Sequence, residues 1–333
     1  MYTKLLLASS VALLTLSGCG SRQYYTPEQT HNASSATMGD SIIHYSRDGA
    51  TLASGNVLTK NQMVKLKLEK GFHFINNAKN VAITADSQGN CNIVAAKGTV
   101  ASAKFPKALV AGTIIGKYLI YVLQDNNFGV YNFETKSVVY NNKSEKVYAI
   151  DTRIANPLHV EQLAVIPTLD GKLVILDLST LKVSKEMYVS TEKSLNNIIF
   201  LGRLKNTLIA ATPNKVLSIS KKGKKELDKA ISEVVIEKDS IFVFAKDGKI
   251  LQLNDELSIN SEKKFKFAHF SVATVYADKV YALDKQGYLV VSNKSFSKHK
   301  VYKVPEVEGY AFVSNGKIYY DGSIIKLNTL SYE

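Results

Sequence analysis

Short apolar runs alternate with turn-forming residues from residue 40 to the end of the chain. Each unit is a β-rich run, a turn pair rich in Gly, Asn and Asp, and a second β-rich run. Gly, Asn and Asp accept the positive φ that tight hairpins need, so the pattern predicts eight β-hairpins. The eight runs and their turn pairs are Ile42–Tyr45 before Asp48-Gly49, Val81–Thr84 before Gln88-Gly89, Tyr118–Leu123 before Asn126-Asn127, Leu163–Ile166 before Asp170-Gly171, Thr207–Ala211 before Asn214-Lys215, Ile241–Ala245 before Asp247-Gly248, Val280–Leu283 before Gln286-Gly287 and Lys317–Tyr320 before Asp321-Gly322.

The turns recur every 33–44 residues, a spacing that fits four short strands with their loops, which is one propeller blade. No helical pattern separates the runs, which argues against βαβ units. We therefore predict an all-β fold: a single β-propeller over residues 40–333 with eight four-stranded antiparallel blades, seven being the alternative. The first unit is irregular, because Ala50–Lys70 is long and Lys-rich. We expect blade one to have three strands or to be completed by the C-terminal segment Leu327–Tyr332.

The clearest unit, Gln162–Asp177, reads Pro-Thr-x-Asp-Gly-x-Leu-x-x-Leu-Asp from Pro167 onward. This resembles the repeat of quinoprotein-like (PQQ-type) propellers, specifically of BamB-type outer-membrane lipoproteins, and residues 240–253, 279–292 and 317–327 follow it loosely. The resemblance implies a scaffold beside the machinery that inserts outer-membrane proteins. The tryptophan that docks adjacent blades in such propellers is absent, since the chain has no Trp. Tyr and Phe are expected to fill those positions.

The beginning of the chain has the pattern of an export signal. Lys4 precedes an apolar run, Leu5–Leu16, which is too short to span a membrane. The ending Leu16-Ser17-Gly18-Cys19 resembles the lipobox of bacterial lipoproteins, which implies cleavage before Cys19 and lipidation of its thiol. We predict a signal peptide over 1–18 and a lipidated Cys19 with a flexible polar tether over 19–39. The alternative is an ordinary signal peptide with an unrelated cysteine. Gly20, rather than Asp, favours the periplasmic side of the outer membrane.

The chain is basic, with a formal net charge of +13, but export makes nucleic acid an unsuitable partner. The densest cluster is Lys221, Lys222, Lys224 and Lys225. Lysines on strand edges discourage sheet-to-sheet aggregation, and the alternative is attraction to anionic lipid or an acidic protein. Cys91 has no partner if Cys19 is lipidated, so we expect it to be a buried apolar residue.

The sequence shows no catalytic arrangement. The six histidines form no His-x-x-x-His or Cys/His set, no calcium loop or nucleophile elbow occurs, and a quinone-dependent dehydrogenase would need stacked tryptophan. We expect no metal and no cofactor. Function is left to loops, of which Tyr148–Glu161 and Val189–Asn197 depart furthest from the repeat. Arg153 and His159 are candidate partner-binding residues, together with the four lysines of residues 221–225.

Three functions fit these observations. The first is a lipid-anchored, non-enzymatic scaffold in outer-membrane protein assembly or another envelope complex. The second is a binding module for an anionic envelope component, such as lipopolysaccharide or a cell-wall polymer. The third is an enzyme with its site in the propeller channel.

Overall fold

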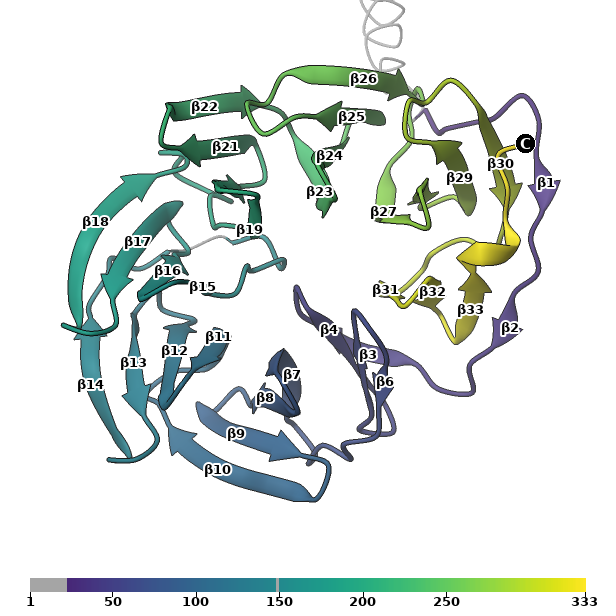
Figure 1. Cartoon of the computed structure of the whole chain (residues 1–333). Helices are drawn as coiled ribbons and strands as arrows, with labels where there is room; N and C mark the ends of the chain where they lie inside the picture. The colour runs from purple at the N-terminus through teal and green to yellow at the C-terminus, as the bar shows by residue number, and fades with distance from the viewer. Residues whose placement is uncertain (1–22, 148–149) are drawn as a thin grey trace, which may run out of the picture.

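The computed structural model describes residues 23–147 and 150–333, which form eight sheets arranged as the blades of a ring, each with four antiparallel strands (Figure 1). The prediction of an eight-bladed β-propeller is confirmed. The one helical segment among these residues is the short 3-10 helix η1 (Leu327–Thr329). None of the described residues forms a helix that could span a membrane.

The strands of blades 1 to 4 follow one another from the channel outward. Blade 1 has β3 (Ile42–Tyr45), β4 (Gly49–Leu52), β5 (Val57–Thr59) and β6 (Met63–Val64); blade 2 has β7 (His73–Ala78), β8 (Val81–Ala85), β9 (Asn90–Ala95) and β10 (Gly98–Lys104); blade 3 has β11 (Leu109–Ile115), β12 (Tyr118–Leu123), β13 (Phe128–Asn132) and β14 (Ser137–Asn142); blade 4 has β15 (Leu158–Val160), β16 (Leu163–Pro167), β17 (Lys172–Asp177) and β18 (Lys182–Tyr188).

Blades 5 to 7 repeat this order, and the chain's own end supplies three strands of blade 8. Blade 5 has β19 (Phe200–Leu204), β20 (Thr207–Ala211), β21 (Lys215–Ser220) and β22 (Gly223–Asp228); blade 6 has β23 (Ile231–Glu237), β24 (Ser240–Ala245), β25 (Lys249–Leu253) and β26 (Ile259–Lys264); blade 7 has β27 (Phe270–Tyr276), β28 (Lys279–Asp284), β29 (Tyr288–Asn293) and β30 (His299–Lys303); blade 8 has β31 (Ala311–Ser314), β32 (Lys317–Tyr320) and β33 (Ser323–Lys326).

All eight predicted hairpins form, but the first has a different place in its blade. In blades 2 to 8 the predicted turn joins the second and third strands, whereas Asp48-Gly49 joins β3 to β4, the first two strands of blade 1. The equivalent turn of blade 1 contains Gly55, whose φ is 80°. Blade 1 is therefore complete within residues 42–64. The expectation that it has three strands, or is completed by Leu327–Tyr332, is wrong.

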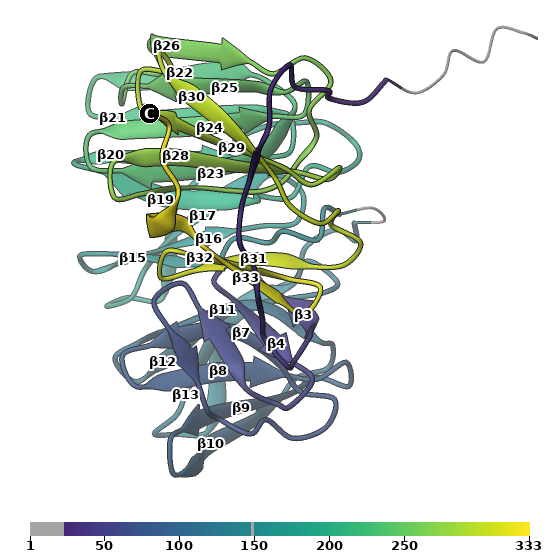
Figure 2. The same ribbon diagram turned by 90° about the vertical axis from the view of Figure 1, so that its right-hand side faces the viewer.

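The segment before blade 1 closes the ring instead. β2 (Ala36–Thr37) pairs antiparallel with β33 as the fourth strand of blade 8, and β1 (His31–Asn32) pairs parallel with β30 as a fifth strand of blade 7. This segment runs across the outer edges of both blades (Figure 2). Tyr25, which is 8% exposed, packs edge-on to the Phe265 and Tyr288 rings at centroid distances of 6.0 and 5.7 Å. The expected flexible tether over 19–39 is thus wrong from Tyr25 onward, because pairing and burial fix this segment to the ring.

The core consists of eight buried apolar clusters, one at each interface between neighbouring blades. The second strand of each blade is buried on both faces, while the outermost strands are mostly exposed. Tyr121, Tyr281 and Tyr320 are the largest fully buried side chains. Tyrosine and phenylalanine therefore fill the interior of a ring that has no tryptophan.

Candidate functional site: the central channel and the outer edges

Arg47 bridges the channel from blade 1 to blade 6. It lies in the turn between β3 and β4, and its Nη1 donates to Glu233 Oε1 at 2.6 Å and its Nη2 to the Val234 carbonyl at 3.0 Å. The guanidinium also lies 5.1 Å from the centroid of the Phe200 ring. Because the side chain is only 12% exposed, this charge-assisted contact is stronger than a surface ion pair.

Arg153 makes a second bridge from the connection between blades 3 and 4. Its Nε and Nη2 donate to the Asp151 carboxylate at 2.7 and 2.5 Å, and its Nη1 donates to the carbonyls of Ile231 and Ser232 on β23. Burial opposes the charge of Arg153, but Asp151 outweighs burial and raises the pKa of the guanidinium. Burial likewise opposes the charge of Asp151, and Arg153 outweighs it and lowers the pKa of that carboxyl. Both groups therefore stay charged.

Both arginines bind β23 because the inner edge of this strand lacks hydrogen-bond partners. β23 is the innermost strand of blade 6, so one of its edges has no neighbouring strand and its carbonyls need other donors. Arg47 and Arg153 supply them, and the hydroxyls of Tyr45 and Thr152 lie 2.9 Å apart and join the two bridging segments. Arg153, expected to be an anchor for a partner, is thus already held by contacts inside the ring.

Beside the bridges, Asp48 forms a partly buried polar cluster with Lys60 and Asn156. Lys60 Nζ lies 2.6 Å from Asp48 Oδ1, and the Asn156 amide donates to Asp48 Oδ2 at 2.6 Å. Burial would raise the pKa of this carboxyl, but Lys60 and the other partners lower it. The Asn156 oxygen accepts from the Gly112 backbone N–H at 2.9 Å, so the cluster connects blade 1 to blade 3.

Two adjoining cavities occupy the channel beside these contacts. The larger, about 1020 Å³, lies among the innermost strands β19, β23, β27 and β31 and is lined in part by Arg153. The smaller, about 480 Å³, is lined by His159 of β15, with Asp48 and Asn156. Both cavities include Arg47 and Lys60. The structure therefore brings the two predicted residues, Arg153 and His159, to neighbouring parts of one channel.

The predicted lysines lie elsewhere. Lys221, Lys222, Lys224 and Lys225 are exposed on the hairpin of β21 and β22, and β22 is the outermost strand of blade 5. Lys222 Nζ lies 2.8 Å from Glu256 Oε1 in an exposed ion pair. The candidate residues from the sequence thus form two separate groups, one at the channel and one at the perimeter. Cys19 lies outside the described residues.

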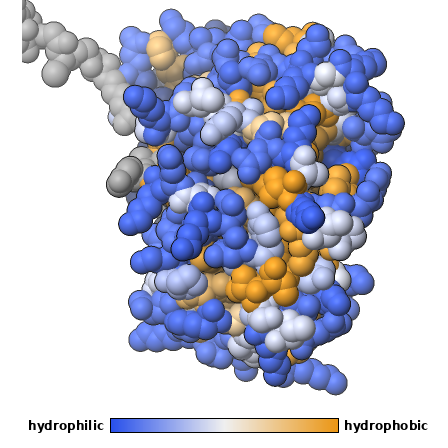
Figure 3. Space-filling model, turned by 90° about the vertical axis from the view of Figure 1, so that its left-hand side faces the viewer, coloured by the Kyte–Doolittle hydropathy of each residue, from blue (hydrophilic) through white to orange (hydrophobic). Residues whose placement is uncertain are grey.

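The outer edges of the blades are unequal. β1 and β2 cover the edges of blades 7 and 8, and the edge strands β18, β22 and β26 all carry Lys and Glu. The edge strand β10 carries Lys104. β14 and the two-residue edge strand β6 contain no charged residue, and β14, the longer of the two, exposes 46% of Val138 and 37% of Val139. Figure 3 views the side of the ring that carries β14 and β18 and shows apolar side chains gathered across it. Tyr140, Leu181 and Val183 of this region are half-buried.

The sequence contained a signal for the channel that the spacing of motifs does not show. Of 42 basic residues only four are arginines, and Arg47, Arg153 and Arg203 all line the larger cavity. Arginine presents several fixed donors and is preferred where a buried cation binds carboxylates or carbonyls. In a chain that otherwise uses lysine, the scarce arginines indicate the channel. Asp48 and Glu233 had no such signal.

Cys91 is 1% exposed in the core between blades 2 and 3, and burial raises the pKa of its thiol to about 12. It is an apolar core residue, as expected. Within residues 23–147 and 150–333 no group of three or more His, Cys, Asp or Glu side chains is placed to hold a metal ion.

Comparison with known proteins gives two kinds of similarity. No family model matches the chain. Two curated relatives are plasminogen-binding proteins PgbB of Helicobacter pylori: that of strain J99 is 24% identical over 358 aligned positions, and that of strain 26695 is 25% identical over 359. Each alignment covers 92% of this chain but 66% of the relative, so the chain spans slightly less than two thirds of their length.

Solved structures share the fold. BamB from Moraxella catarrhalis has a TM-score of 0.65 at 15% identity, covering 89% of this chain and 98% of BamB. The C-terminal WD40 domain of Sif2 has a TM-score of 0.64 at 10% identity, covering 89% of this chain and 99% of that domain. At such identities the likeness shows the fold alone, and this chain has a BamB-like β-propeller fold.

Proposed function

We propose that this protein is a lipid-anchored, non-enzymatic β-propeller on the periplasmic side of the outer membrane that docks envelope proteins. The lipobox-like ending at Cys19 supports the anchor, and the BamB-like fold supports a scaffold role by analogy. Arg47 and Arg153 bind other groups of this protein, so we look for the docking surface on the outer edges of the blades.

The observation that carries the proposal is the uncharged, exposed edge of β14. Exposed edge strands with apolar side chains are templates for pairing with another chain, and proteins usually protect them with lysine or with a covering segment. Six edges of the described ring are covered by β1 or β2 or carry lysine, and the uncharged edge strand β6 is only two residues long. β14 is thus the one uncharged edge strand of six residues among the described blades, and two of its valines are exposed. An extended segment of a partner would add to β14 as a further strand, as β1 adds to β30 within the molecule itself.

The test is affinity purification of the full-length lipoprotein from detergent-solubilised envelopes. The double variant Val138→Lys/Val139→Lys places two charges on the open edge, and we expect at least a tenfold loss of the captured envelope protein. The matched control is Ile259→Lys/Asn260→Lys, which adds the same charge to the exposed outermost strand of blade 6. Equal capture by wild type and the β14 variant would contradict docking at this edge.

A second candidate function is binding of plasminogen, which the name of the PgbB relatives states for those proteins. The observation that favours it here is the exposed lysine cluster of residues 221–225. Immobilised plasminogen should retain wild type, and the variant with Lys221, Lys222, Lys224 and Lys225 changed to Gln should be retained less. If the quadruple variant binds as wild type does, the lysine cluster is not the site.

A further inference from the structure

The larger channel cavity has the size of a ligand site and an excess of positive charge. Its volume of about 1020 Å³ is at the upper end of the roughly 300–1,000 Å³ typical of ligand pockets. Six basic residues line it, against two carboxylates. The lining cations are Arg47, Lys60, Arg153, Arg203, Lys246 and Lys285.

Three of these cations are already neutralised. Arg47 pairs with Glu233, Lys60 with Asp48 and Arg153 with Asp151. Arg203, Lys246 and Lys285 have no carboxylate within 4.0 Å among the residues that the structure describes. Lys246 contributes only at longer range to the lowered pKa of Asp151. Glu237 is the one remaining carboxylate in the lining. The cavity therefore keeps an excess of two positive charges after all its ion pairs are formed.

The two free lysines occupy equivalent positions in neighbouring blades. Each stands two residues before the positive-φ glycine of its turn, and its backbone N–H donates to the connection entering the same blade, Lys246 to Ala230 and Lys285 to His269. The residues that stand at this position in blades 1 to 4 are Ala53, Ser87, Gln124 and Leu169. Lysine at this position is thus not required by the turn, and it occurs in two of the four blades whose innermost strands line the larger cavity.

The wall between these cations mixes apolar side chains with small ones. The inward strands contribute small residues, among them Gly202, Ser232, Ser271 and Ala273. Because these strands are the innermost of their blades, no strand pairs with one edge of each. On β23, Arg47 and Arg153 already bind carbonyls of this edge, so a peptide would pair with β19, β27 or β31. An extended peptide could hydrogen-bond to such an edge, while its carboxylates meet the separated cations.

We propose that the channel between blades 5 and 8 binds an acidic, extended peptide segment through Arg203, Lys246 and Lys285. Arg153 shapes the wall of this site, and Arg47 separates it from the smaller cavity. The site is distinct from the β14 edge and from the perimeter lysines, so it does not depend on either docking proposal.

The probe is a fluorescein-labelled hexaglutamate peptide, and the measurement is fluorescence anisotropy at low and physiological salt with the full chain. The test variant carries Arg203→Gln, Lys246→Gln and Lys285→Gln. We expect it to bind at least about tenfold more weakly than wild type, because three cations without an ion-pair partner are removed from a partly enclosed site.

The matched control removes the same charge from the perimeter by Lys221→Gln, Lys224→Gln and Lys225→Gln. We expect its affinity to change by less than about twofold, since screened charges beyond the Debye length contribute little. Circular dichroism melts of both variants check that the ring is folded. An equal loss in the control, or no binding by wild type, would overturn the proposal.

Discussion

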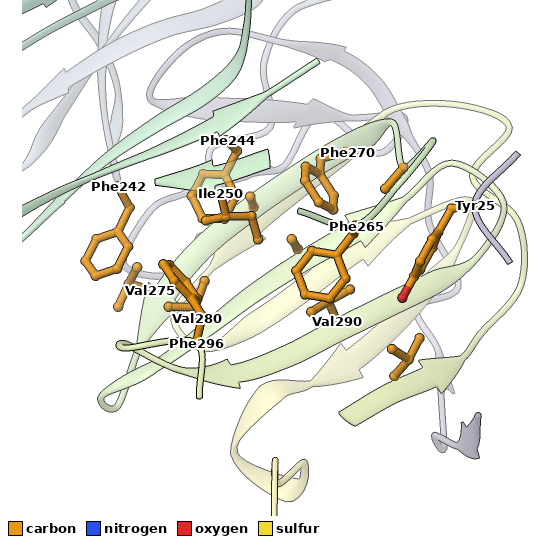
Figure 4. Close-up of a cluster of buried hydrophobic side chains, with 14 residues drawn as sticks. Tyr25, Phe242, Phe244, Ile250, Phe265, Phe270, Val275, Val280, Val290 and Phe296 are labelled. Atoms are coloured by element: carbon orange, nitrogen blue, oxygen red, sulfur yellow. The ribbon is translucent and has the colours of Figure 1, made fainter. Parts of the chain in front are cut away.

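The interface between blades 6 and 7 is a large apolar cluster, whereas the interface between blades 1 and 2 is a small one beside two stacked histidines. The first buries fourteen apolar residues, including five phenylalanines, and Tyr25 from the N-terminal segment closes its outer end (Figure 4). The second buries three, Val57, Phe74 and Ala82. The rings of His44 and His73, on the first strands of blades 1 and 2, stack there at 4.3 Å, and neither buried Nδ1 has a hydrogen-bond partner in the described structure.

The two interfaces differ in how strongly they hold the ring together and in how they respond to pH. Apolar burial contributes about 25 cal/mol per Å² and does not depend on pH. Stacked imidazoles contribute little apolar area, and protonation penalises them. We therefore expect the blade 1–2 interface to open more easily than the blade 6–7 interface, above all at low pH.

We expect the greatest loss of stability when the Phe265 ring is removed. This side chain is 3% exposed and contacts Tyr25, Phe270 and His299 edge-on. Phe265→Ala should lower the free energy of unfolding by about 3–5 kcal/mol, because the cavity lies in a well-packed cluster. This loss is measured by urea unfolding of wild type and variant, monitored by circular dichroism. A loss below about 1 kcal/mol would show that this interface is not the firm one.

The second prediction concerns pH at the other interface. Burial, together with the charge of His73, lowers the pKa of His44 from its ordinary 6.5 to about 4, and burial lowers the pKa of His73. The unfolded state therefore binds more protons between pH 6.5 and 4, so stability falls as the pH falls through that window and is fully present above it. Because the His44 ring is partly exposed, we expect a loss of about 1–2 kcal/mol.

The variant that tests this is His44→Phe, which keeps a flat ring against His73. It should unfold with a weaker dependence on pH between 7 and 4.5 than wild type does. His159→Gln, at an exposed position of β15, is the control and should keep the wild-type dependence. If His44→Phe loses as much stability on acidification as wild type, other groups carry the effect.

The contrast between the two interfaces also separates what the sequence could predict from what it could not. The hairpins were predictable because turn chemistry is local: Asp247-Gly248 or Gln286-Gly287 fixes its own two strands. The register of blade 1 was not, since Asp48-Gly49 and the less obvious turn at Gly55 compete for the same role. Tyr25 lies in a polar stretch with no periodicity, so nothing near it shows that it is buried.

The contacts that line the channel were the hardest to predict from the sequence. Arg47 and Glu233 are 186 residues apart, and their contact exists only once eight blades have closed a ring. The long loop that carries Arg153 predicts a functional role for this residue, but nothing in the sequence predicts its partners on β23. Local pattern thus fixes the blades, while contacts across the ring depend on closure.

The third prediction compares one substitution at both interfaces, and the expected difference is about 1 kcal/mol. Val290 is 1% exposed among the phenylalanines of the blade 6–7 cluster, and Val57 is fully buried in the three-residue cluster of blades 1 and 2. Val290→Ala should cost about 2 kcal/mol and Val57→Ala about 1 kcal/mol, because neighbours in a small cluster can move into the vacated space and those in a rigid aromatic cluster cannot. Both are measured by urea unfolding at pH 7.5, where the histidines are neutral in either state. Equal costs would mean that the two interfaces are equally well packed, and the sensitivity of the ring at blades 1 and 2 would then rest on the histidine pair alone.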